Sequence, residues 1–328
     1  MWHNLRCIPW GCDVNFIDQE IVLDTAAPYG DAIPLPLSSA LFRRLEETAR
    51  PCVRMALEGT SAHAGAPPIW LQRASEIRTI GFSANNGQSV LHVRAQTLGV
   101  AAPELFEQPT LWPGFARPEE TVLQVMARIS DAVRRKETGE DFYDPSLLKH
   151  FSHWKGIFEN SLRGLKLPQP VTGARNLAVL DAQVPESARQ LSSETPSPRQ
   201  VRVVGKLDVI RHSTRSFGLL LEGDQEVRGV LAEGTPELLL RYFGKEITVL
   251  GKAIYRPSGS LLRIDAQEII ETTEGRAAFS RVPAALSKAP RPDKRFQNDK
   301  TGVAAFFGTW PGEETDEELL AALGELRH

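Results

Sequence analysis

The sequence predicts an α+β protein with an N-terminal mixed α/β domain, a small OB-like five-stranded β-barrel and a helical C-terminal tail. Two observations lead to this fold class. Residues 201–270 hold five runs rich in leucine and β-branched residues, with a short helical run between the third and the fourth. Residues 1–165 instead mix amphipathic helical patterns with a few β-like runs.

The size and composition of the chain are those of an ordinary globular protein. Its 328 residues, 41% hydrophobic and 24% charged, suit roughly two domains. No apolar run approaches the roughly 20 residues of a membrane helix, and the first residues lack the apolar core of a signal peptide. We therefore expect a cytoplasmic protein that does not enter a membrane. Three cysteines, Cys7, Cys12 and Cys52, are too few for a disulfide framework.

The N-terminal domain, 1–165, is expected to combine three strands with three helices. The β-like runs are 15–23, 78–84 and 88–95, and the helical patterns are 38–57, 118–136 and 145–165. An Asn-Gly pair, Asn86-Gly87, separates the second and third β-like runs and indicates a hairpin. Pro51 lies inside the first helical pattern, which predicts either one kinked helix or two helices.

Two further segments have the composition of connections. Residues 166–200 contain five prolines among Ser, Thr and Gln and predict a Pro-rich linker. Residues 271–305 combine prolines with lysines and arginines and few β-branched or aromatic residues, so we expect a flexible basic segment there.

The predicted barrel, 201–270, has the connectivity of an OB-type barrel, which is three strands, one helix and two strands. The strands are 201–210, 217–221, 227–231, 246–256 and 261–270, and the helix is 235–243. Barrels of this type usually bind nucleic acid, oligosaccharide or protein, so the fold points toward binding, although fold alone does not give function.

The tail, 306–328, carries an apolar stripe on a short predicted helix. Thr315 and Glu318 fit a capping box at the start of that helix. Such a tail is expected to dock on a protein surface, either its own barrel or a partner, because Trp anchors and helices in grooves are common recognition modes. The residues predicted to bind the partner are Phe306, Phe307, Trp310, Leu319, Leu320 and Leu323.

Two parts of the chain resemble known proteins. The barrel and the tail together resemble a group of poorly characterised bacterial proteins that have an OB-like domain and a similar Trp-Pro-Gly tail. The resemblance lies in the barrel segments VGKLDVI, VRGVL and GKEITVLGKAIYRPSGSLLRIDA and in the tail segment TWPGEETDEELLAALGEL. Some of these proteins are encoded next to toxin-like partners such as PIN-type nucleases, so the resemblance implies an antitoxin-like or accessory role. The stretch beginning PPIWLQRASEIRTIGF resembles a bacterial domain of unknown function. The resemblance assigns no catalytic residue.

The chain carries no strong catalytic motif. There is no Gly-x-Ser-x-Gly elbow, no P-loop and no Gly-x-Gly-x-x-Gly after a strand. His150 and His153 share a helix face and could bind a metal with Asp141 or Asp144, but this spacing is more often a solvated or packing face. Cys7 and Cys12 lack further ligands nearby. We therefore expect no metal, no cofactor and no catalytic residue.

Cationic residues on the barrel offer a second kind of site. A groove for single-stranded nucleic acid combines cations with aromatic stacking platforms, and Tyr255 beside Arg256 is the best stacking pair here. The candidate nucleic-acid-binding residues are Arg211, Arg215, Arg228, Lys252, Tyr255, Arg256 and Arg263. The barrel segment 196–270 has eleven Lys and Arg against nine Asp and Glu, so the arginines could equally be solvating a nearly neutral surface.

The sequence thus favours a non-catalytic binding or regulatory accessory protein that acts through contacts with a protein partner. One alternative is a single-stranded nucleic-acid-binding protein that uses the barrel. The other is an enzyme with a polar pocket in the N-terminal domain converging on His63, His92 or His150. The oligomeric state is left open.

Overall fold

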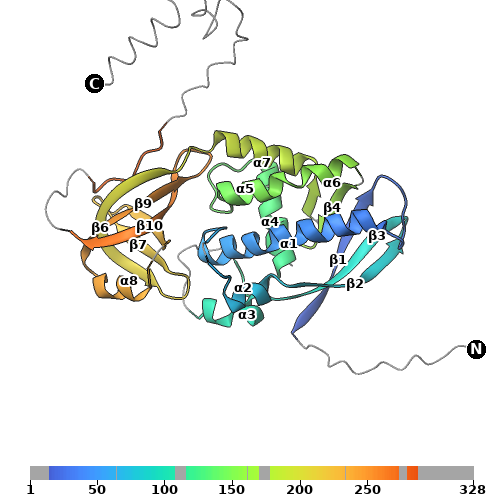
Figure 1. Ribbon diagram of the computed structural model, residues 1–328, viewed down its shortest axis with the longest axis horizontal. Helices are drawn as coiled ribbons and strands as arrows, with labels where there is room; N and C mark the ends of the chain where they lie inside the picture. Colours follow the sequence, from blue (N-terminus) through green and yellow to red (C-terminus); the bar gives the residue numbers. More distant parts are fainter. Residues whose placement is uncertain are drawn as a thin grey trace, which may run out of the picture. The chain divides into compact units, whose positions relative to one another are not determined.

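The computed structural model describes residues 15–63, 65–107, 116–160, 162–169, 178–232, 234–272 and 279–286 (Figure 1). Residues Met1–Ser287 form one compact unit, which holds both the N-terminal domain and the barrel. The predicted tail with its partner-binding residues, most of the predicted basic segment, Cys7 and Cys12 lie outside the described residues.

A five-stranded antiparallel sheet forms the base of the N-terminal domain. Its strands are β1 (Phe16–Thr25), β2 (Ile77–Asn85), β3 (Gln88–Gln96), β4 (Leu162–Leu167) and β5 (Ala178–Asp181), in the order β2-β3-β1-β4-β5. The predicted hairpin is confirmed, because β2 and β3 pair up to Asn85 and Gln88 across Asn86 and Gly87, both at positive φ. Two-residue turns of this type favour an Asn-Gly pair.

Helices cover one face of this sheet, and α1 and α4 pack against each other over it (Figure 1). The helices of the domain are α1 (Leu35–Glu58), α2 (Ile69–Ala74), α3 (Leu98–Ala101), the 3-10 helix η1 (Pro103–Leu105), α4 (Val122–Arg135), α5 (Pro145–Ser152), α6 (Lys155–Asn160) and α7 (Gln183–Glu194). Pro51 lies inside a single helix, α1, so the alternative of two helices is wrong. The residue after α1, Gly59, is in the left-handed conformation that commonly ends a helix.

Two predictions for this domain need correction. The helix expected over 145–165 is split into α5 and α6, and its last residues begin strand β4, which pairs with β1. The expected linker, 166–200, contains β5 and α7. Val184, Ala188 and Leu191 of α7 are fully buried, a helical stripe that the prolines concealed. Pro185 lies in the first turn of α7, where a missing backbone N–H costs little.

The second half of the chain forms a closed five-stranded barrel, as predicted. Its elements are β6 (Arg199–Arg211), β7 (Ser216–Leu220), β8 (Glu226–Leu231), α8 (Glu237–Tyr242), β9 (Glu246–Tyr255) and β10 (Leu261–Glu271). The strand order is β10-β8-β7-β6-β9, in which β8 and β10 are parallel and the other pairs antiparallel. The structure therefore confirms the mixed α+β class and the closed barrel.

Alternate residues of these strands fill the barrel interior. Val203 and Leu207 from β6, Phe217 from β7 and Ile264 from β10 are fully buried, and Leu239 of α8 joins the same cluster. Within the described residues, no helix is both long enough and apolar enough to cross a membrane.

Gly229 of β8 makes room for the Phe217 ring, because a Cβ atom there would lie far inside van der Waals distance of the ring. We expect Gly229→Ala to lower the free energy of unfolding by about 1–3 kcal/mol through overpacking, measured by urea denaturation. Gly81→Ala is the matched control, since Gly81 is also in a strand and has open space around its Cβ position. Equal losses of unfolding free energy in both variants would show that contact with the Phe217 ring is not what restricts position 229 to glycine.

Candidate functional site

The most elaborate polar site in the described chain is the domain joint, where the barrel meets the N-terminal domain. Its apolar part comes from Val230, Ile254 and Leu262 of the barrel, which are buried in the core cluster of the N-terminal domain. Its polar part is formed by five barrel arginines and by their partners in the N-terminal domain. The arginines are Arg211, Arg215, Arg228, Arg256 and Arg263, and the partners are His63, Thr60, Leu105, Asp141 and Asp144.

A buried ion pair lies at the centre of the domain joint. Arg263 donates from Nη2 to Asp144 at 3.1 Å and to Thr60 Oγ1 at 3.0 Å, and from Nε to Asp265 at 2.7 Å. The side chains of Arg263 and Asp144 are only 4% and 2% exposed. Asp144 also accepts hydrogen bonds from the Ser61 backbone and hydroxyl and from the Leu147 backbone, and so caps α5.

These contacts keep Asp144 ionised. Burial by itself raises the pKa of the Asp144 carboxyl, but the Arg263 guanidinium and the hydrogen bonds from Ser61 and Leu147 outweigh it and hold the pKa below its ordinary value. Burial lowers the pKa of Arg263, but Asp144 and Asp265 reverse this and raise it. Both groups therefore remain charged in the interior, where each depends on the other.

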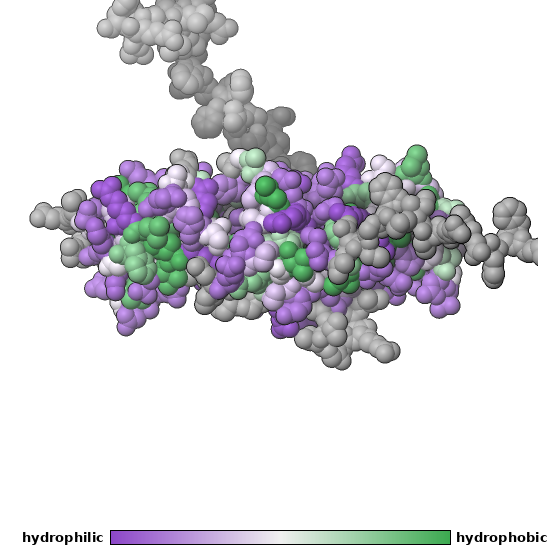
Figure 2. Space-filling view, turned by 90° about the horizontal axis from the view of Figure 1, so that it is seen from below, coloured by the Kyte–Doolittle hydropathy of each residue, from purple (hydrophilic) through white to green (hydrophobic). Residues whose placement is uncertain are grey.

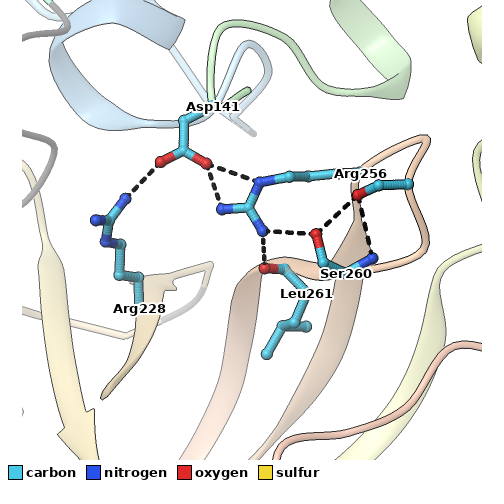
Figure 3. A network of polar contacts seen from close by, with 6 residues as sticks. Asp141, Arg228, Arg256, Ser260 and Leu261 are labelled. Carbon is cyan, nitrogen blue, oxygen red and sulfur yellow. Dashed lines mark hydrogen bonds and ion pairs between the residues drawn. The ribbon is translucent and has the colours of Figure 1, made fainter. Parts of the chain in front are cut away.

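A second carboxylate, Asp141, lies between Arg228 and Arg256 (Figure 3). Its side chain is 26% exposed, so it marks the solvent-accessible side of the domain joint. Arg228 Nη1 donates to one of its oxygens at 2.6 Å, and Arg256 donates to the other from Nε at 2.9 Å and from Nη2. The third nitrogen of Arg256 bonds to Ser260 Oγ and to the Leu261 carbonyl. Two guanidinium groups from different barrel segments thus converge on one carboxylate.

Local structure explains why Asp141 is presented in this way. Helix α4 ends at Lys136 in the left-handed conformation, and α5 begins after its cap Asp144. The connection between them is held by Tyr143, which is buried and donates its hydroxyl to the Glu137 carbonyl. On the barrel, strand alternation turns Val227 inward, so that Arg228 faces outward toward Asp141.

A third part of the domain joint lies at the C-terminal end of α1. Arg215 contacts His63 Nε2 at 3.1 Å, and Glu58 lies 3.1 Å from Arg54 Nε. Burial raises the pKa of Glu58 to about 7, although Arg54 and Arg215 each act to lower it. The carboxyl of Glu58 therefore takes up its proton near neutral pH.

These positions correct part of the predicted nucleic-acid site. Tyr255 is 1% exposed and donates its hydroxyl to the Ala284 carbonyl, so it offers no ring face for stacking. Five of the seven predicted residues are the arginines of the domain joint, and Arg211 and Arg263 among them are buried. Lys252 is exposed on β9. The sequence pattern showed cations pointing outward from the barrel but not that a second domain covers them.

The sequence offers Asp141 and Asp144 as possible metal ligands beside His150 and His153, although it favours a solvated or packing face. In the structure, both carboxylates bond to barrel arginines. The described residues contain no group of three His, Cys, Asp or Glu side chains placed to hold a metal ion. The signal that could have found Asp144 was its position directly before Pro145, which is typical of a helix cap.

Of the three histidines named for an enzyme site, His92 has the most suggestive surroundings. Ser83 Oγ lies 2.6 Å from His92 Nε2, and Glu20 lies 3.5 Å from Nδ1. Glu20 is 61% exposed, however, and the three residues belong to strands β2, β3 and β1 of the sheet. None of the three histidines lines the cavities near Phe42, near Arg228 or near Gly244.

No family model matches the chain, and neither the curated proteins nor the solved structures contain a match.

The buried ion pair yields a stability prediction. We expect Asp144→Asn to lower the free energy of unfolding by about 3 kcal/mol, because it leaves the buried Arg263 with one carboxylate fewer. Asp265→Asn removes the other carboxylate that bonds to Arg263. Because the Asp265 side chain is 29% exposed, we expect this variant to lose less than about 1 kcal/mol of unfolding free energy. Urea denaturation measures the free energy of unfolding of both variants. Equal losses in the two variants would contradict a special role for the buried Arg263–Asp144 pair.

Glu58 yields a prediction for pH. Its folded-state pKa of about 7 exceeds the ordinary 4.5, so between these values the folded state binds more protons than the unfolded state. The free energy of unfolding should therefore fall, by about 3 kcal/mol, as the pH rises from 4.5 to above 7. Glu58→Gln should remove this decrease, whereas Glu46→Gln, an exposed change on the same helix, should keep it. Denaturant titrations at several pH values measure the free energy of unfolding of both variants. The same pH dependence in Glu58→Gln and Glu46→Gln would show that Glu58 does not cause the decrease.

Proposed function

We propose that this protein is a non-catalytic binding protein that acts as an accessory or regulatory partner through protein contacts. The observation that carries the proposal is the domain joint. There the barrel presents its outward arginines and the apolar Val230, Ile254 and Leu262 to a folded protein surface in the same chain. This use of the barrel face favours contacts with protein, because five of the eleven Lys and Arg residues in 196–270 bond there to groups of the N-terminal domain.

The finer fold assignment belongs to the same proposal. We infer that the barrel is of the OB type. Three features support this: an antiparallel meander of β6, β7 and β8, the parallel pairing of β8 with β10, and α8 between the third and fourth strands. In such barrels, ligands bind on the face of the second and third strands and on the loops after the first and fourth strands. Arg228 on β8, Arg215 after β6 and Arg256 after β9 occupy these positions.

An exposed hydrophobic patch on the barrel also supports protein contacts. Leu240 of α8 and Phe243 directly after it are 58% and 57% exposed. Hydrophobic side chains gather at the same end of the molecule (Figure 2). Exposed apolar surface of this kind commonly marks an interaction site. The predicted tail, with Trp310 as its anchor, is the second partner-binding element of the proposal. An antitoxin-like role toward a PIN-type nuclease is its most specific form.

The test is affinity capture from the producing organism, with bound protein and nucleic acid both quantified. We expect a defined protein partner to be retained by the full chain and lost with Trp310→Ala or with the double variant Leu240→Ser and Phe243→Ser. Leu35→Ser is the control, because Leu35 is 80% exposed but lies outside both proposed elements.

Two outcomes would contradict the proposal. One is the same set of captured proteins with all variants, which would indicate non-specific adsorption. The other is the recovery of nucleic acid alone, released by salt, which would move the function to the nucleic-acid alternative.

A further inference from the structure

We propose that Arg228, Arg256 and Ser260 form a binding site for a phosphate group, and that Asp141 occupies the place of this anion in the unliganded protein. The proposal goes beyond the protein-contact function and does not depend on it. It assigns a ligand chemistry to the solvent-accessible side of the domain joint.

The first observation is a cavity beside the two arginines, with Asp141 itself outside its lining. It has a volume of about 330 Å³ and is lined by Arg228, Arg256 and Ser260 together with apolar atoms of Val227, Leu262 and Val282. The guanidinium groups and the hydroxyl come from three barrel segments: strand β8, the residue after β9 and the turn before β10. A cavity of this size suits a phosphate group with part of the molecule that carries it.

The second observation is the geometry of the two arginines. Arg256 donates to Asp141 Oδ1 from Nε and Nη2, and Arg228 donates to Oδ2 at 2.6 Å (Figure 3). Two N–H groups of Arg256 thus converge on one oxygen while Arg228 binds the other, and guanidinium groups bind phosphate oxygens through the same donors. The Asp141 carboxylate therefore shows where two oxygens of an anion are held, and Ser260 bonds to the third nitrogen of Arg256, on the side away from Asp141 (Figure 3).

A phosphate group suits these donors better than one carboxylate does. Arg228 and Arg256 already bond to both oxygens of Asp141. Glu226 lines the same cavity, and its negative charge weakens the binding of any anion there. A phosphate group offers more oxygens and up to about two negative charges, and it can thus replace Asp141 where a second carboxylate would gain little.

The third observation is that Asp141 can leave without separation of the domains. The side chains of Asp141 and Arg228 are each 26% exposed and that of Arg256 is 15% exposed, whereas the Arg263–Asp144 pair is almost fully buried. The buried pair and the apolar contacts of Val230, Ile254 and Leu262 hold the domains together. A movement confined to the connection between α4 and α5 is enough to exchange Asp141 for a ligand.

The experiment compares two charge-matched variants of the full chain. Asp141→Asn removes the competing carboxylate, and Glu140→Gln makes the same charge change one residue away on an exposed side chain. Inorganic phosphate is titrated by calorimetry, and a fluorescent single-stranded oligothymidylate is titrated by anisotropy at low salt. We expect Asp141→Asn to tighten phosphate binding about tenfold and Glu140→Gln to leave it unchanged.

A second pair of variants separates binding from folding. In the Asp141→Asn background, Arg256→Lys keeps the charge but loses the planar fork, so we expect the gained phosphate affinity to be lost while the urea midpoint stays close to that of the parent. Arg228→Gln should lose it as well. If the oligothymidylate binds and inorganic phosphate competes with it, the phosphate comes from a nucleic-acid strand. If phosphate alone binds, the ligand is a small phosphate compound.

Three results would overturn the proposal. The first is equal tightening in Asp141→Asn and Glu140→Gln, which would reveal only the general field of the protein. The second is no phosphate binding in either variant. The third is phosphate binding that survives both Arg256→Lys and Arg228→Gln. Each of these leaves the protein-contact function untouched, because that function is read from partner capture and not from anion binding.

Discussion

The arrangement of this protein depends on one buried ion pair, Arg263 with Asp144. Asp144 caps α5, holds Ser61 after α1 and neutralises an arginine from the last barrel strand, so a single carboxylate links two helices to the barrel. Removing such charges from water costs much free energy, and Asp144 compensates by accepting hydrogen bonds from Ser61, Leu147 and Arg263. Nη1 of Arg263 has no hydrogen-bond partner among the described residues. The geometry around Asp144 is therefore strongly constrained, and with it the position of the barrel on the N-terminal domain.

The exposure of the ion pairs in the domain joint increases from its interior toward solvent. Apolar contacts and Arg263–Asp144 form its closed part, whereas Asp141 with Arg228 and Arg256 forms its accessible part. Ion pairs of the second kind are individually weak, since water competes for both partners. The closed part thus holds the two domains together. In our proposal, the accessible part supplies the groups that exchange Asp141 for an anion.

Prediction from sequence succeeded where the signal was local. The five barrel strands, the Asn86-Gly87 hairpin and α4 follow from periodicity and turn chemistry that neighbouring residues fix among themselves. It failed where composition hid a pattern: the prolines and serines of 166–200 suggested a linker, although Val184, Ala188 and Leu191 provide a helical stripe for α7. A composition signal averages over residues, while a helix needs only three or four of them to face the core.

The sequence by itself determined the mixed α+β class, the closed barrel and the presence of outward-facing arginines on it. Only the tertiary structure decided that Asp141 and Asp144 meet those arginines, and that Tyr255 is buried rather than offered for stacking. The physical reason is that strand alternation separates the interior of a barrel from its exterior but does not distinguish an exterior facing water from one facing another domain. That distinction arises from contacts between residues more than a hundred positions apart, such as Asp141 with Arg256.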